Sequence, residues 1–175
     1  IDLYLIHWPL NDLRNDSWKA FIELQKRGLC RSIGVSNFTI DNLKELEEKY
    51  DVLPAINQVE FHPYHYQKEL LEYCNSKNII IEAYSPLVHA KRMDEPRLIA
   101  ISDELGKTPA QVLIRWAIQR GMVVLPKSVN QDRIVENFAV FDFDISNSLM
   151  RRLDDLDERY VTCWDPHNPP PYAPV

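Results

Sequence analysis

The chain begins with the stretch Ile1-Asp2-Leu3-Tyr4-Leu5-Ile6-His7-Trp8-Pro9, in which apolar and aromatic residues lead to a histidine. A short apolar run that ends at a proline is typical of a strand buried on both faces, as in a parallel sheet. The carboxyl end of such a strand is where α/β sheets and βα-barrels place their active sites. His7 is therefore the first candidate functional residue. Because a buried strand is an unusual first element, we expect the chain to be a piece of a larger protein.

Composition restricts the function classes. The 175 residues are enough for one domain, and the net charge of −6 disfavours nucleic acid or an anionic membrane surface as the main partner. The three widely spaced cysteines, Cys30, Cys74 and Cys163, fit free thiols in a reducing compartment and predict a cytoplasmic location. With only four glycines, the chain has no glycine-rich phosphate loop. No apolar run approaches the length of a membrane span.

Strand and helix patterns alternate along the whole chain. Apolar strand-like runs centre near residues 3, 33, 57, 81 and 124, and helices lie between them. Helix start signals include Asp16 or Ser17, Thr39, the run Thr108-Pro109-Ala110-Gln111, Asn130 and Ser146. The alternation predicts a parallel sheet, either an open doubly wound sheet or part of a (β/α)8 TIM barrel, which needs eight strands. We expect about five βα units, a C-terminal helix and, over residues 164–175, an extended Pro-rich arm.

Hydrogen-bonding side chains follow each predicted strand, whereas the strand starts are apolar. These polar positions are His7, Ser36-Asn37, Asn57-Gln58, Tyr84-Ser85 and Lys127-Ser128. In a parallel sheet they would converge on one face and form a pocket. The alternative is that strand ends meet water and are polar for that reason alone.

The stretch from Lys127 to Asn137 is the clearest binding feature of the sequence. Lys127 and Ser128 precede a helix start, where backbone N–H groups and the helix dipole favour an anion. Arg133 lies three residues beyond the Asn130 cap, and its guanidinium suits a phosphate. The sequence therefore predicts a phosphate site. The alternative is a solvated helix start with scattered charges.

Other side chains offer further recognition chemistry. Asn37 and Gln58 could bind a carboxamide, and Tyr84 could stack on a ligand ring, although strand aromatics commonly belong to the core. His7 could donate a hydrogen bond to a carbonyl or share a proton, or could be structural. His62 and His65 lack a third ligand in their Pro-containing loop, so no metal site is predicted.

Five motifs occur in an order that resembles the aldo-keto reductase family. They are Leu5-Ile6-His7-Trp8-Pro9, Ile33-Gly34-Val35-Ser36-Asn37-Phe38, Asn57-Gln58-Val59-Glu60-Phe61-His62-Pro63-Tyr64, Ala83-Tyr84-Ser85-Pro86-Leu87 and Leu125-Pro126-Lys127-Ser128-Val129. The resemblance covers almost the whole chain. It implies an NADP(H)-dependent (α/β)8-barrel oxidoreductase that reduces aldehydes and ketones to alcohols.

The resemblance also implies roles for individual residues. His7 corresponds to the catalytic histidine that orients the substrate carbonyl, and Trp8 to a residue that lines the substrate pocket. The implied cofactor contacts run from the nicotinamide to the adenine end: Ser36, Asn37 and Gln58 at the carboxamide, Tyr84 on the ring, Ser85 and Leu87 at the pyrophosphate, Lys127, Ser128, Val129 and Arg133 at the 2′-phosphate, and Glu136 and Asn137 at the adenine.

The departures from the family pattern matter equally. The family's catalytic Tyr, Lys and Asp come from strands before the histidine strand, so the resemblance gives them no counterpart in this chain. The loop Val88-His89-Ala90-Lys91-Arg92 lacks the expected small-residue pattern. We therefore expect residues 1–163 to be the C-terminal part of one reductase barrel that is inactive alone, with a small-molecule carbonyl as the substrate of the intact, monomeric protein.

Two other hypotheses remain open. The chain could be a non-catalytic truncated homologue that binds a dinucleotide or associates with another chain through open barrel edges. The sequence could also come from a partial gene model, in which case the full protein is an ordinary reductase.

Overall fold

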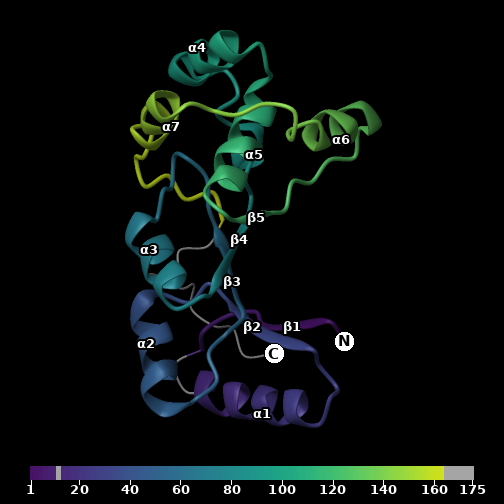
Figure 1. Ribbon diagram of the computed structural model, residues 1–175, viewed down its shortest axis with the longest axis vertical. Helices are drawn as coiled ribbons and strands as arrows, with labels where there is room; N and C mark the ends of the chain where they lie inside the picture. The colour runs from purple at the N-terminus through teal and green to yellow at the C-terminus, as the bar shows by residue number, and fades with distance from the viewer. Residues whose placement is uncertain (11–12, 164–175) are drawn as a thin grey trace. The chain divides into compact units, whose positions relative to one another are not determined.

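Strands and helices alternate along the chain in the computed structural model, which describes residues 1–10 and 13–163 (Figure 1). The elements are β1 (Leu3–Ile6), α1 (Arg14–Lys26), β2 (Ser32–Ser36), α2 (Ile40–Lys49), β3 (Ile56–Glu60), α3 (Lys68–Ser76), β4 (Ile80–Tyr84), the 3₁₀ turn η1 (Val88–Ala90), α4 (Pro96–Leu105), α5 (Pro109–Gln119), β5 (Val123–Val124), α6 (Gln131–Phe138) and α7 (Asn147–Asp154).

The five strands form a sheet in the order β1-β2-β3-β4-β5. Strand β1 pairs in parallel with β2, β2 with β3, and β4 with β5. The predicted alternation and the predicted parallel sheet are thus confirmed. The last strand has only two residues and is shorter than its apolar run suggests. No helix of the described residues is long and apolar enough to cross a membrane.

By internal contacts the described chain forms two compact units. The first contains Ile1–Val59 and Lys68–Ile81, and the second contains Glu60–Gln67 and Glu82–Cys163. The backbone passes from one unit to the other within β3, returns between Gln67 and Lys68, and passes again within β4. The expected single barrel over residues 1–163 stays a prediction, and the expected Pro-rich arm at 164–175 lies outside the described residues.

The first unit is built on close packing of β1, β2 and β3. An added Cβ at Gly34 would lie 2.7 Å from the carbonyl oxygen of Ile56, so glycine allows the close approach of β2 to β3. The fully buried Asn57 amide donates to the carbonyl of Phe38 at 2.9 Å and accepts from its N–H at 3.3 Å. Buried Trp18, Leu43 and Leu46 come from α1 and α2 and complete this core.

The second unit has its own core around α5. Trp116 is fully buried, and its indole N–H donates to Asp154 of α7 at 2.9 Å. Nη2 of Arg120 donates to both oxygens of the same carboxylate, and Nη1 donates to the Tyr66 hydroxyl at 2.8 Å. Its guanidinium also lies 4.6 Å from the Tyr66 ring centroid. This cluster fixes the position of α7 relative to α5.

Most of the predicted helix caps are confirmed. Thr39 and Thr108 form capping boxes, and Asn130 and Ser146 accept from backbone N–H groups of the first turn. The predicted cap of the first helix at Asp16 or Ser17 is wrong. That helix begins at Arg14, whose N–H already bonds to the Leu10 carbonyl, so no side-chain cap is used.

Candidate functional site

In the first unit, the polar residues at the ends of β1 and β2 form a bonded cluster with Gln58 of β3. The Asn37 side-chain amide donates to the His7 carbonyl at 3.1 Å and to the Ser36 hydroxyl at 3.0 Å. The Ser36 hydroxyl and the Asn37 backbone N–H both donate to the Gln58 carbonyl, at 2.8 and 2.9 Å. The structure therefore brings together four of the five residues predicted in this unit; the fifth, Trp8, follows His7 directly and is half-buried.

Backbone geometry fixes the orientation of this cluster. Asn37 has φ 63°, in the left-handed region that asparagine tolerates better than most residues. Ser36 and Asn37 are buried, whereas the His7 side chain is exposed. A buried hydroxyl and amide thus lie at the strand ends, and the amide is bonded to the backbone of His7, whose side chain is exposed.

The expectation that Asn57 and Gln58 both follow a strand and face a pocket is wrong. Strand β3 extends to Glu60, so both residues lie within it. Successive side chains of a strand point to opposite faces. The Asn57 side chain lies in the core, where it bonds to the backbone N–H and carbonyl of Phe38. Only Gln58 remains a candidate for the site.

In the second unit, three predicted residues lie at the end of β4. Tyr84 is its last residue, and burial, together with the charges of Glu60 and Cys163, raises the pKa of its hydroxyl, which therefore stays neutral. The Ser85 hydroxyl lies 3.1 Å from Nε2 of His89. Leu87 is half-buried just before η1.

The predicted phosphate residues lie at the start of α6. Asn130 accepts from the Arg133 N–H at 3.0 Å, and Ser128 accepts from the Asn130 N–H at 3.1 Å. Lys127, Val129 and Arg133 are exposed. Over residues 1–10 and 13–163, neither Lys127 nor Arg133 takes part in an ion pair. Two cationic side chains beside a helix N-terminus are available for an anion.

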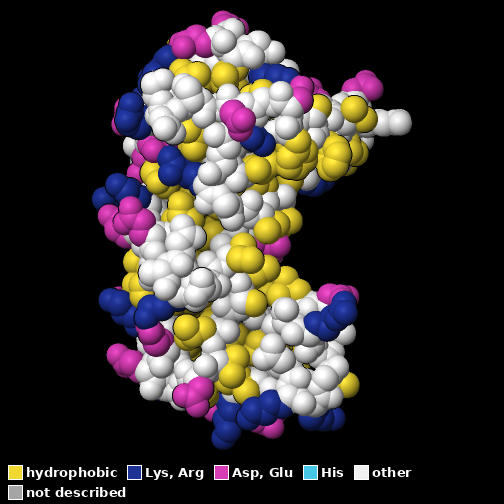
Figure 2. All heavy atoms as spheres, viewed as in Figure 1, with side chains coloured by type: hydrophobic (Ala, Val, Ile, Leu, Met, Phe, Trp, Pro, Cys, Tyr) yellow, Lys and Arg dark blue, Asp and Glu magenta, His cyan; other side chains and the backbone are white. Residues whose placement is uncertain are grey.

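The last two predicted residues are on α6. The Glu136 carboxylate accepts from the hydroxyl of Thr108, the N-cap of α5, at 2.5 Å. Asn137 is buried and, with Ser128, lines a groove of about 420 Å³ whose other walls are Pro126, Ile134, Val135 and Phe138. Figure 2 shows hydrophobic side chains gathered on this face around α6. Glu136 therefore has a structural partner, whereas Asn137 borders an open groove.

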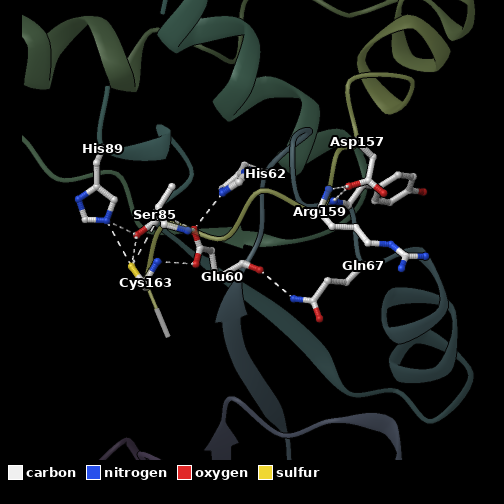
Figure 3. Close-up of polar contacts among 10 residues, drawn as sticks. Glu60, His62, Gln67, Ser85, His89, Asp157, Arg159 and Cys163 are labelled. Atoms are coloured by element: carbon white, nitrogen blue, oxygen red, sulfur yellow. Dashed lines mark hydrogen bonds and ion pairs between the residues drawn. The ribbon is translucent and has the colours of Figure 1, made fainter. Parts of the chain in front are cut away.

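Sequence reasoning gave no role to a buried carboxylate network in the second unit (Figure 3). Glu60 is 3% exposed, and its Oε1 lies 3.0 Å from Nε2 of His62. The same carboxylate accepts from the backbone N–H groups of Thr162 and Cys163, at 2.8 and 3.0 Å. Burial alone would raise the pKa of Glu60, but the hydrogen bonds from His62 and Thr162 outweigh it and lower the pKa to about 2. The sequence feature that could have pointed to this network is the position of Glu60 among the apolar residues of a strand.

No group of three or more potential metal ligands occurs among the described residues. Nε2 of His62 lies beside Glu60, and a backbone bridge joins His62 to His65. An ionised carboxylate only accepts hydrogen bonds, so His62 carries its proton on Nε2. This histidine has a structural role.

Comparison with known proteins places these features in a family. The family model described as "Aldo/keto reductase family" matches residues 1–158. Glyoxal reductase of Bacillus subtilis is 46% identical over 161 residues, which are 91% of this chain and 58% of that protein. The chain spans about three-fifths of the length of the curated relatives it matches.

Solved structures agree with this result. An aldo/keto reductase from Brucella melitensis is 42% identical, with a TM-score of 0.85 over 90% of this chain and 61% of that one. A Bombyx mori aldo-keto reductase in complex with NADP is 32% identical, with a TM-score of 0.86 over 93% of this chain and 59% of that one. The fold is thus that of part of a (β/α)8 barrel rather than an open doubly wound sheet. The family model, the sequence relatives and the solved structures agree that this chain belongs to the aldo-keto reductase family.

Proposed function

We propose that this chain supplies the cofactor-binding part of an NADP(H)-dependent oxidoreductase that reduces small aldehydes or ketones. The observation that carries the proposal is the strand-end cluster of His7, Ser36, Asn37 and Gln58, within a chain that belongs to the aldo-keto reductase family. Related structures have been solved with NADP or NADPH. When bound, the cofactor would supply a hydride to the carbonyl carbon.

The residues of the first unit fit the nicotinamide end of such a cofactor. A carboxamide needs both donors and acceptors. The Gln58 side chain contains both, whereas the Asn37 NH₂ group already donates to His7 and Ser36 and would contribute its oxygen. Ser36 is held by its bond to the Gln58 carbonyl, so the cluster is ordered before any ligand arrives. The exposed imidazole of His7 would bind and orient the substrate carbonyl, next to Trp8 at the pocket wall.

The residues of the second unit fit the remaining parts of the cofactor. Tyr84 would offer a neutral ring for stacking, and Ser85 and Leu87 would lie along the pyrophosphate. Lys127 and Arg133, with Ser128 and Val129, would hold a 2′-phosphate at the start of α6. Glu136 and Asn137 would lie at the adenine.

The expected NADPH selectivity gives a direct test. Replacing Lys127 or Arg133 by alanine removes one charge-assisted contact, and the Kd for NADPH should rise about 10- to 100-fold. The Kd for NADH, which lacks the 2′-phosphate, should change less than about threefold. Arg151→Ala, at an exposed position in α7, is the matched control and should leave both affinities unchanged. Equal binding of NADPH and NADH by the original chain would overturn the 2′-phosphate assignment.

We further propose that reduction requires a Tyr, a Lys and an Asp for which residues 1–175 offer no match. General acid catalysis typically contributes 10²- to 10⁴-fold, so the purified chain should not oxidise NADPH in the presence of a reactive aldehyde. Measurable turnover that disappears in His7→Ala would contradict this part of the proposal.

A second function, association with another chain, is favoured by the exposed apolar face of α6. Val135 and Phe138 are 66% and 75% exposed, and Phe141, beyond the helix, is 65% exposed. Single large apolar side chains are common on surfaces, but a contiguous group is typical of an interaction site. Sedimentation of the purified chain would distinguish a monomer from an assembly.

A further inference from the structure

Three side chains with nucleophilic or basic groups meet at the end of the described chain in the second unit (Figure 3). Sγ of Cys163 lies 3.3 Å from Nε2 of His89 and 3.3 Å from the Ser85 hydroxyl. The hydroxyl and the imidazole are themselves 3.1 Å apart. A thiol within hydrogen-bond reach of an imidazole is the arrangement by which proteins activate a cysteine nucleophile.

Buried contacts fix the position of the thiol. The Cys163 N–H donates to Oε2 of Glu60, and the Thr162 N–H donates to Oε1 of the same carboxylate. Because Glu60 is 3% exposed and bonded to His62, it gives the backbone of Cys163 a rigid anchor. The side chains of Cys163 and His89 remain exposed, so a reagent can reach the sulfur.

The other two cysteines provide an internal contrast. Cys30 is 4% exposed, and Cys74 is fully buried, with its pKa raised to about 12 by burial. A buried thiol is protonated and inaccessible, whereas reactive cysteines are partly exposed and lie beside a base. All three cysteines are free, as predicted from their number and spacing.

We propose that Cys163 is a thiolation site for low-molecular-weight disulfides, with His89 as the base. The thiol proton of Cys163 passes to Nε2 of His89, and the thiolate attacks one sulfur of the incoming disulfide. A new S–S bond forms at Cys163 while the original S–S bond breaks. The departing thiolate takes the proton from His89, so one thiol and one disulfide yield one disulfide and one thiol. This modification does not require the proposed reductase function, although it would take place beside Ser85, which that proposal puts at the pyrophosphate.

The test uses oxidised glutathione with the native 175-residue chain and follows adduct formation by intact-protein mass spectrometry. We expect one adduct, which peptide mapping should place on Cys163 and which Cys163→Ser should abolish. His89→Gln should slow the reaction about tenfold, since it removes the proton acceptor but not the thiol. Lys91→Gln is the matched control, because it removes a positive charge from the same loop without removing a base, and its rate should stay within about twofold.

Two results would overturn the proposal. The first is an adduct that forms on Cys30 or Cys74 before Cys163 under native conditions. The second is a His89→Gln rate equal to that of the original chain, which would mean that exposure alone determines reactivity. Circular dichroism of each variant verifies that the fold is retained.

Discussion

Glu60→Gln tests whether the buried carboxylate stabilises the folded chain through its charge. Glutamine has nearly the same shape, so the substitution removes the charge and leaves no cavity. Lowering the pKa from 4.5 to about 2 corresponds to about 3 kcal/mol, at 1.36 kcal/mol for each pH unit. We expect Glu60→Gln to lower the free energy of unfolding at pH 7 by about 2–3 kcal/mol, since the amide oxygen retains part of the hydrogen bonding.

The pH dependence makes this prediction specific. Because the pKa of Glu60 is lowered in the folded state, its contribution is fully present above about pH 5 and is lost as the pH falls toward 2. Urea unfolding between pH 7 and pH 2.5 should therefore show the two proteins converging in stability. Other carboxylates, such as Glu45, whose pKa is also lowered to about 2, titrate in both proteins and cancel in the difference.

The control for this experiment is Glu48→Gln, at an exposed position on α2. It should change the free energy of unfolding by less than about 0.5 kcal/mol at every pH. The reasoning would be refuted by a difference between the original chain and Glu60→Gln that stays constant from pH 7 to pH 2.5. Such a result would mean that the loss comes from replacing an acceptor oxygen by an amide NH₂ group and not from the charge.

Four further substitutions probe the packing, each measured by urea unfolding at pH 7. Gly34→Ala should lower the free energy of unfolding by about 2 kcal/mol, because the new Cβ would lie 2.7 Å from a backbone oxygen. Gly28→Ala has open space around the new Cβ but a φ of +73°, and should cost about 1 kcal/mol. Equal losses would contradict the steric argument. Arg120→Lys should cost about 1–2 kcal/mol, because a lysine lacks the second nitrogen with which Arg120 bonds to the Tyr66 hydroxyl while Nη2 bonds to Asp154; an unchanged stability would show that a point charge is enough there. Asn57→Ala should cost about 2–3 kcal/mol by leaving backbone groups unsatisfied; a loss below about 1 kcal/mol would indicate that water replaces the amide.

The fold could be predicted from the sequence because its signals are local. Apolar runs, proline stops and capping residues depend on neighbours within a few positions, and four of the predicted caps are found where expected. The prediction failed at the first helix, where a backbone bond from Arg14 to Leu10 begins the helix without a side-chain cap. It also grouped Asn57 with the residues at strand ends, although Asn57 lies near the start of β3.

The carboxylate network was beyond sequence reasoning because its partners are far apart in the chain. Glu60 bonds to Thr162, 102 positions later, and His89 lies 74 positions before Cys163. No periodicity connects such residues; only the folded chain brings them together. The sequence could show that Glu60 was an unusual residue in an apolar strand, but not what it binds.

Some of the predicted cofactor residues already bond to other residues of the chain, and others do not. This difference indicates which of them are available to bind a cofactor and which also stabilise the fold. Ser85 and Glu136 have partners in His89 and Thr108, so a cofactor must compete with those bonds or share them. Lys127 and Arg133 have no ion-pair partner within the described residues, so their charge is available to an incoming phosphate. Anion recognition should therefore begin at these two cations, and substitutions at Glu136 should act first on the start of α5 and only secondarily on affinity.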